Sequence, residues 1–176
     1  MDITFDDARH SLLDIGGVWR HLLTSSGWCA MERGSDLIEP LDLLKAIYVV
    51  DIEHVSRYWD DWENYERFLL TIKLGNGEQV EFLNRHLILF QQFLAARENK
   101  GRPIWLGTPS EDLCAVAFAA KKIVQDRRGE EFPSSKDLLY CVCLQHRDLA
   151  AELCKHGLNF EKLERDVLSG NESRPK

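Results

Sequence analysis

The chain has 176 residues, with 22 basic and 29 acidic side chains and a formal net charge of −7 at pH 7. This length is enough to bury a hydrophobic core without disulfides or metals, so we expect one compact domain or two small halves that share a core. Nucleic acids and anionic membranes attract clustered basic residues. The acidic balance therefore disfavours a general role with either partner.

Cysteine usage and the first residues of the chain predict that the protein is found in a reducing compartment. The cysteines are odd in number, which does not suit a disulfide framework, and most lie in apolar helical patterns: Cys29, Cys114, Cys141, Cys143 and Cys154. We interpret them as reduced, small core residues. The first residues are acidic where a signal peptide is basic, and no run of about 18 apolar residues follows. We expect a soluble, cytoplasmic protein.

An internal match organises the chain. When the chain is shifted back by 95 residues without a gap, three segments fall on similar ones. Arg128-Gly129 falls on Arg33-Gly34, Asp137-Leu138-Leu139 falls on Asp42-Leu43-Leu44, and residues 159–163 fall on residues 64–68. Because these matches occur in the same order and at one spacing, we interpret the chain as a tandem repeat.

The first copy is expected to span about residues 18–70. Four helices are predicted in it: 18–32, one that starts at Pro40, 51–59 and 61–70. Gly34 is placed to end the first helix, although Ser25-Ser26-Gly27 weakens it. Asp42 lies in the first turn of the second helix, where the helix dipole favours a negative charge.

An insertion at about residues 71–107 separates the two copies. Alternating apolar and polar residues on both sides of Gly75-Asn76-Gly77 predict a β-hairpin over residues 70–82. A strongly apolar helix at 84–98 is expected to support it, because an isolated hairpin is only marginally stable.

The second copy is expected to span about residues 108–168. Thr108 and Glu111 fit a capping box, and the helix that follows should end at Gly129. Ser134 and Asn159 are expected to cap two later helices, with a further helix at 147–156. Residues 171–176 are predicted to be a flexible tail or linker.

This order of helices and turns resembles the Clp repeat, which occurs twice in the N-terminal domains of Clp-type AAA+ unfoldases. The second copy carries the resemblance best. It has Asp137-Leu138-Leu139 where the family usually has His-Leu-Leu. Residues 158–163, which follow Gly157, fit the family's segment of glycine, hydrophobic residue, Asp or Asn, hydrophobic residue, two variable residues and leucine. The inter-repeat segment is longer than in the family, and the first copy has unusual aromatic residues.

The resemblance implies an all-α domain over residues 1–170, built as a pseudo-twofold tandem repeat of two four-helix units with the hairpin and helix inserted between them. It also implies a non-catalytic role in chaperone and proteolysis pathways, in which the domain receives substrates or adaptor proteins for an ATPase ring. The chain has no G-x-x-x-x-G-K-[ST] phosphate loop, so it does not contain the motor.

We expect the partner to be a protein or a peptide segment, including an AAA+ unfoldase or its clients. The partner should dock in the cleft between the copies or on a corner of aromatic and acidic residues: Tyr58, Trp59, Asp60, Asp61, Trp62 and Glu63. Exposed aromatic residues beside charges are typical of binding hot spots, and the carboxylates favour a basic segment. The alternative is that Trp59 and Trp62 fill space beside the hairpin.

Two other function classes remain open. One is a small metal-dependent enzyme built on Cys141, Cys143, Cys154 and His156. Residues two apart on a helix point about 200° from each other, which does not suit a zinc site, and the thiols lie among apolar residues. We therefore expect no catalytic residue, no cofactor and no metal. The other class is a dedicated inhibitory protein of the immunity type.

Overall fold

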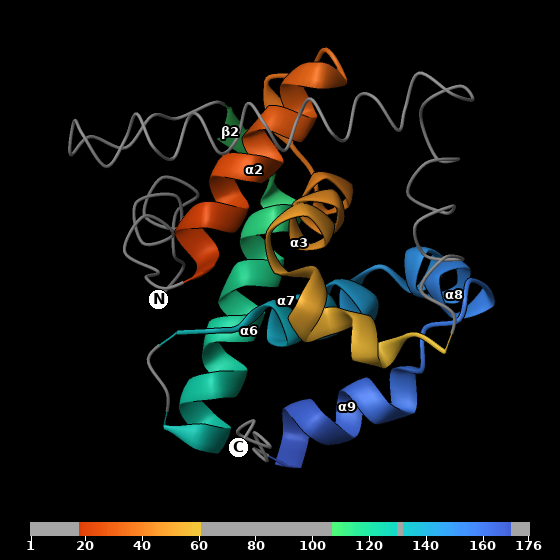
Figure 1. Cartoon of the computed structure of the whole chain (residues 1–176). Helices are drawn as coiled ribbons and strands as arrows, with labels where there is room; N and C mark the ends of the chain where they lie inside the picture. Colours follow the sequence, from red (N-terminus) through yellow and green to blue (C-terminus); the bar gives the residue numbers. More distant parts are fainter. Residues whose placement is uncertain (1–17, 61–106, 130–131, 170–176) are drawn as a thin grey trace.

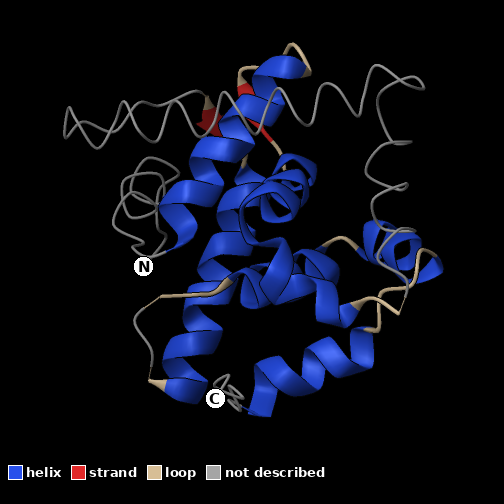
Figure 2. Cartoon of the chain, in the orientation of Figure 1, coloured by secondary structure: helices blue, strands red, loops and turns tan. Residues whose placement is uncertain are grey.

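The computed structural model describes residues 18–60, 107–129 and 132–169 (Figure 1). These residues are mostly helical, with one small two-stranded sheet (Figure 2). The predicted helix 61–70, the hairpin, the helix 84–98 and the tail lie outside the described residues. In chain order the elements are α2 Val18–Glu32, β1 Leu37–Ile38, α3 Pro40–Val55, the 3-10 helix η1 Ser56–Tyr58, β2 Thr108–Pro109, α6 Glu111–Arg128, α7 Ser135–Gln145, α8 Arg147–Lys155 and α9 Phe160–Ser169.

The first predicted helix is confirmed with its bounds, and it runs unbroken through Ser25-Ser26-Gly27. The Thr24 hydroxyl donates to the Arg20 carbonyl at 2.9 Å, and the Ser26 hydroxyl donates to the Leu22 carbonyl at 2.7 Å. These bonds, each made four residues back, satisfy both hydroxyls within the helix. The hydroxyl of Ser26, which is fully buried, is thereby accommodated within the buried face of the helix, and Thr24 is partly buried.

Glycines end α2 and α6, as the sequence predicts. Gly34 has φ +74° and Gly129 has φ +64°, both in the left-handed region that glycine adopts without a steric penalty. After α2, the Gly34 amide donates to the Met31 carbonyl at 2.8 Å and the Ser35 amide donates to the Ala30 carbonyl at 2.9 Å. This pattern is the Schellman motif, which satisfies the last carbonyls of a helix.

Helix α3 starts at Pro40 as predicted and is kinked at Asp51, whose backbone has φ −140° and ψ 34°. The sequence predicts that a new helix begins at this residue. The segment that follows is shorter than the predicted 51–59 helix, because η1 takes over at Ser56 and Trp59 is extended. His54 Nδ1 contacts Asp51 Oδ1 across the kink.

The small sheet pairs Leu37–Ile38 with Thr108–Pro109 in parallel, and no sequence pattern predicts it. It also corrects the start of α6. Thr108 does not cap this helix, because its amide donates to the Asp36 carbonyl at 2.8 Å as part of the sheet. Ser110 is the cap instead, and its hydroxyl oxygen accepts from the Leu113 amide at 3.1 Å.

Two arginine–aspartate ion pairs occur at the positions that the internal match aligns. Arg33 Nη2 lies 2.7 Å from Asp42 Oδ2, and Arg128 Nη2 lies 2.7 Å from Asp137 Oδ2. Both aspartates are fully buried. Arg33 directly follows α2, and Arg128 is the last residue of α6. Asp42 and Asp137 lie in the first turns of α3 and α7, so each pair joins two consecutive helices.

The same aspartates also hold the start of their own helices. Asp42 Oδ2 accepts from the Glu39 amide at 2.9 Å, and Asp137 Oδ2 accepts from the Ser134 amide at 2.8 Å. An acidic side chain three residues after the cap satisfies one of the amides that a helix start leaves without a partner. Later in the chain, the predicted cap at Asn159 is also confirmed, because its Oδ1 accepts from the Lys162 amide at 3.0 Å.

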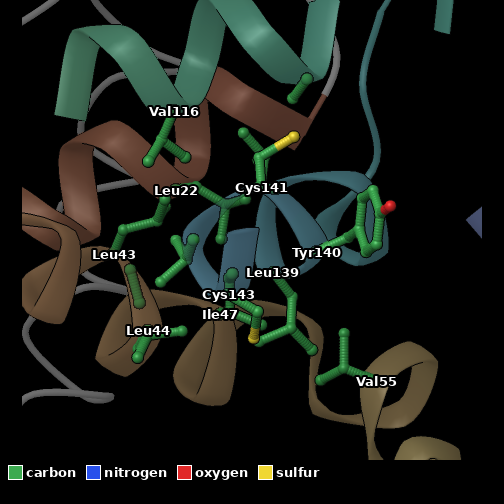
Figure 3. Packing of buried hydrophobic residues seen from close by; sticks show 14 of the residues in the cluster. Leu22, Leu43, Leu44, Ile47, Val55, Val116, Leu139, Tyr140, Cys141 and Cys143 are labelled. Atoms are coloured by element: carbon green, nitrogen blue, oxygen red, sulfur yellow. The ribbon is translucent and has the colours of Figure 1, made fainter. Parts of the chain in front are cut away.

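The core forms where α2 packs on α3, α6 packs on α7, and α3 meets α7. Figure 3 shows side chains of these four helices converging, among them Leu22, Leu43, Val116 and Leu139, which are fully buried. Each such side chain contributes about 1.5–3 kcal/mol by leaving water. Helix α7 is central, since it also contacts α8 and α9. Within the described ranges, no helix has the length and apolar character needed to cross a bilayer.

Candidate partner-binding groove

An open groove of about 690 Å³ lies where the start of α3, the start of α6 and the corner between α7 and α8 meet. Its lining comes from Arg33 and residues 39–41 in the first half of the chain and from Asp112 and residues 145–149 in the second half. The groove therefore lies between elements of the two predicted copies. A partner segment was expected to dock in a cleft of this kind.

Two hydrogen bonds connect the elements that frame the groove. The Ser110 amide donates to the Ile38 carbonyl at 2.9 Å, which joins the segment before α6 to the segment before α3. Gln145 Nε2 donates to the Ala115 carbonyl at 3.1 Å, which joins the end of α7 to α6. The first bond joins the segments that lead into α6 and α3, and the second joins α7 to α6, so the elements that frame the groove are held to one another without a partner.

Arg33 lies at the edge of the groove, but its charge is already paired. The guanidinium donates to both carboxylate oxygens of Asp42, at 2.7 and 3.4 Å, and Nη2 also donates to the Leu37 carbonyl at 2.9 Å. The hydrogen bond to Asp42 is the main reason that the pKa of Arg33 is raised. The arginine therefore stays charged, and its charge is directed at Asp42.

The remaining charges of the groove are mainly negative. They are the carboxylates of Glu39, Asp112 and Asp148 and the guanidinium of Arg147. Asp112, Arg147 and Asp148 are exposed, and within the described part of the chain none of them forms an ion pair. Three carboxylates against one guanidinium leave an excess of two negative charges.

Apolar surface lies beside these charges. Pro40 is buried, and Leu41 and Leu149 are partly buried and pack against the hydrophobic core. All three line the groove. An apolar side chain of a partner could cover Leu41 and Leu149, and area removed from water in this way would supply affinity.

The aromatic–acidic corner predicted from the sequence divides between core and surface. Tyr58 is fully buried, and Trp59 is 6% exposed. Burial is the largest cause of the raised pKa of the Tyr58 hydroxyl. Asp60 is exposed. Asp61, Trp62 and Glu63 lie outside the described residues.

Backbone pairing accompanies the burial of Tyr58 and Trp59. Trp59 forms an antiparallel bridge with Leu158. The Asp60 amide donates to the Gly157 carbonyl at 3.0 Å, and the Asn159 amide donates to the Tyr58 carbonyl at 2.7 Å. Trp59 is thus part of the hydrophobic core, whereas the hairpin beside which it was expected to fill space lies outside the described residues. Partner binding by this corner stays a prediction, with Asp60 as its exposed member among the described residues.

The cysteines do not form a reactive centre in this structure. All five are reduced, and four are buried, whereas Cys154 on α8 is exposed and is not the core residue that the sequence predicts. Burial raises the thiol pKa of Cys141 to about 12, and that of Cys143 to about 12 as well. Thiols with such pKa values stay protonated at neutral pH, so they are poor nucleophiles.

A metal site on these cysteines has no support in the described ranges, where no group of three or more His, Cys, Asp or Glu side chains is arranged to hold an ion. Comparison with known proteins gives no further guide, since no protein family, curated protein or solved structure matches the chain. Of the candidate sites, the groove is therefore the one that the described residues define most fully.

Proposed function

We propose that this protein is a non-catalytic module that binds a protein or peptide segment in the groove between α3, α6 and the α7–α8 corner. The observation that carries the proposal is the groove itself, which combines apolar surface at Leu41 and Leu149 with exposed charges at Asp112, Arg147 and Asp148. Binding surfaces of this kind take affinity from apolar anchors and selectivity from charges.

We further propose that the module is a double Clp repeat, a pseudo-twofold pair of four-helix units that receives substrates or adaptors for an AAA+ unfoldase in the cytoplasm. The matched ion pairs Arg33–Asp42 and Arg128–Asp137 support a repeated architecture, because each joins two consecutive helices in the same way. The link to an unfoldase rests on the resemblance of the sequence.

The test is capture of partners from the source lysate with the tagged protein, with and without ATP, followed by mass spectrometry. We expect an AAA+ unfoldase or its clients. Leu149→Gln should reduce this capture, because a polar side chain then replaces an apolar one in the groove. The matched control is Ala151→Gln, on the same helix but exposed and outside the groove lining.

Thermal unfolding of both variants shows whether each stays folded. If folded Leu149→Gln and Ala151→Gln capture the same partners at the same yield, the groove is not the binding site. Recovery of one unrelated protein, with no ATPase, would instead favour the alternative of a dedicated inhibitory protein. A small Cys/His enzyme has less support, because the thiols of Cys141 and Cys143 stay protonated at neutral pH.

A further inference from the structure

We propose that the groove selects an extended segment in which a lysine or arginine stands next to an apolar residue. This inference rests on the proposed function, since it names the chemistry of the partner for the same groove. The basic side chain would lie among the carboxylates of Glu39, Asp112 and Asp148, and the apolar neighbour would cover Leu41 and Leu149.

The charge of the groove is the first argument. Arg33 is paired with Asp42 and also attracts Glu39, so it offsets the acids of the groove only in part. Asp112 and Asp148 are exposed and form no ion pair with another described residue, so their charges are available to a partner. A complementary positive charge on the partner would speed its association and exclude acidic segments.

The helix dipoles oppose this charge only in part. Asp112 and Asp148 lie in the first turns of α6 and α8, where each helix start has a positive partial charge of about half a unit. The start of α3 adds a further positive partial charge at the groove and the end of α7 adds an opposing negative one. The four helix ends together offset about one of the two excess negative charges, and their effect falls off within one turn. The groove therefore stays negative at the surface that a partner meets.

The apolar surface is the second argument. A lysine or arginine has a long aliphatic stem that packs on apolar surface while its charged end stays in water. Leu41 and Leu149 provide such surface within the groove, close in the chain to Glu39 and Asp148. A polar segment without an apolar residue would gain the charge interaction but lose this burial.

A peptide series tests the proposal directly. The probes are fluorescein-labelled peptides of Gly and Ser that differ in a central pair: Lys-Leu, Gln-Leu, Glu-Leu or Lys-Gly. Fluorescence anisotropy with the full chain gives the Kd of each. We expect Lys-Leu to bind about tenfold tighter than Gln-Leu or Lys-Gly, which corresponds to about 1.4 kcal/mol. The Lys-Leu affinity should fall as ionic strength rises from about 0.05 to about 0.3 M.

Variants assign the preference to the groove. The double variant Asp112→Asn, Asp148→Asn should bring the Lys-Leu and Gln-Leu affinities within about twofold. Asp126→Asn is the matched control, because Asp126 is an exposed acid on α6 outside the groove lining. It should keep the tenfold preference. Thermal unfolding of each variant confirms that it is folded.

The outcomes separate this inference from the proposed function. Equal binding of Lys-Leu and Gln-Leu, or tighter binding of Glu-Leu, would overturn the preference for a basic segment and leave a peptide-binding groove in place. Failure of every peptide to bind would also overturn the inference, and the lysate capture with Leu149→Gln and Ala151→Gln would then decide whether the groove binds another kind of protein surface. An unchanged preference in the double variant would place the selection outside the groove.

Discussion

The two arginine–aspartate ion pairs share one contact but differ in their other contacts and in their surroundings. In both, Nη2 of the arginine lies 2.7 Å from Oδ2 of an aspartate that is fully buried, nine residues later in the chain. Arg33 Nε also donates to Asp42 Oδ1 at 3.4 Å, whereas Asp137 Oδ1 accepts no hydrogen bond from a described residue. The Arg33 side chain is 24% exposed at the groove, whereas the Arg128 side chain is 4% exposed. The local sequence therefore fixes the pair, and the elements packed around it decide whether water and a partner can reach it.

The largest effect is expected from Asp137→Ala. This change removes a fully buried carboxylate that accepts from Arg128 and from the amide and hydroxyl of Ser134. Breaking one partner of a buried ion pair costs about 3–5 kcal/mol. Urea unfolding followed by circular dichroism should show this loss. A loss below about 1 kcal/mol, the size of an exposed pair, would show that burial does not strengthen the interaction.

Asp42→Ala should cost less, about 1–3 kcal/mol, because the partly exposed Arg33 can turn to water while the Glu39 amide loses its acceptor. The same urea experiment measures the difference between the two variants. The comparison fails if Asp42→Ala destabilises the protein as much as Asp137→Ala, since the exposure of the arginine would then have no effect.

Alkaline pH should lower the stability of the protein through α7. This helix has Cys141 and Cys143 at the positions that the internal match aligns with Ala46 and Tyr48 of α3. Burial raises the thiol pKa of Cys141 from 9.0 to about 12. The folded state therefore favours the neutral thiol. The contribution of this thiol to the free energy of unfolding is fully present below pH 9 and is lost as pH rises toward 12. At pH 10 the loss is at most about 1.4 kcal/mol per thiol.

The measurement is urea unfolding at pH 8 and pH 10 for the natural chain and for Cys141→Ala. The variant should show a smaller fall in stability between these pH values, whatever its stability at pH 8. An equal fall in both proteins would mean that the Cys141 thiol does not control the alkaline response.

Effects of a similar small size are expected from Gly34→Ala and Gly129→Ala. An added Cβ meets nothing within 4 Å at either position, so the cost comes only from the positive φ. That cost is about 1–2 kcal/mol and should be equal at the two sites. Thermal unfolding of the pair of variants checks it. Unequal values would show that the two helix ends differ in more than the exposure of their arginines.

Local signals explain what could be predicted about the fold. The bounds of α2, the glycines Gly34 and Gly129, and the caps Ser134 and Asn159 each follow from residues within a few positions of one another. The sheet could not be predicted, because two residues at Leu37–Ile38 pair with two residues far along the chain and neither has a strand pattern. The same pairing displaced the cap of α6 from Thr108 to Ser110.

The candidate site shows a similar limit. A cleft between the copies was expected, but Glu39, Asp112 and Asp148 were not singled out, because each is an ordinary acid near a helix start. Only the tertiary structure brings them to one groove. In the predicted corner, composition indicated an exposed surface, whereas Trp59, which forms a bridge with Leu158, is buried. Backbone pairing between distant segments leaves no signal in composition.

The packing of α3 on α7 has a consequence for synthesis of the chain. The apolar side chains of Leu43, Leu44 and Ile47 leave the ribosome well before α7, which completes their cover. At typical translation rates this interval lasts on the order of ten seconds. During that time the nascent first half presents an apolar surface, so we expect it to depend on ribosome-associated chaperones until residues 135–145 emerge.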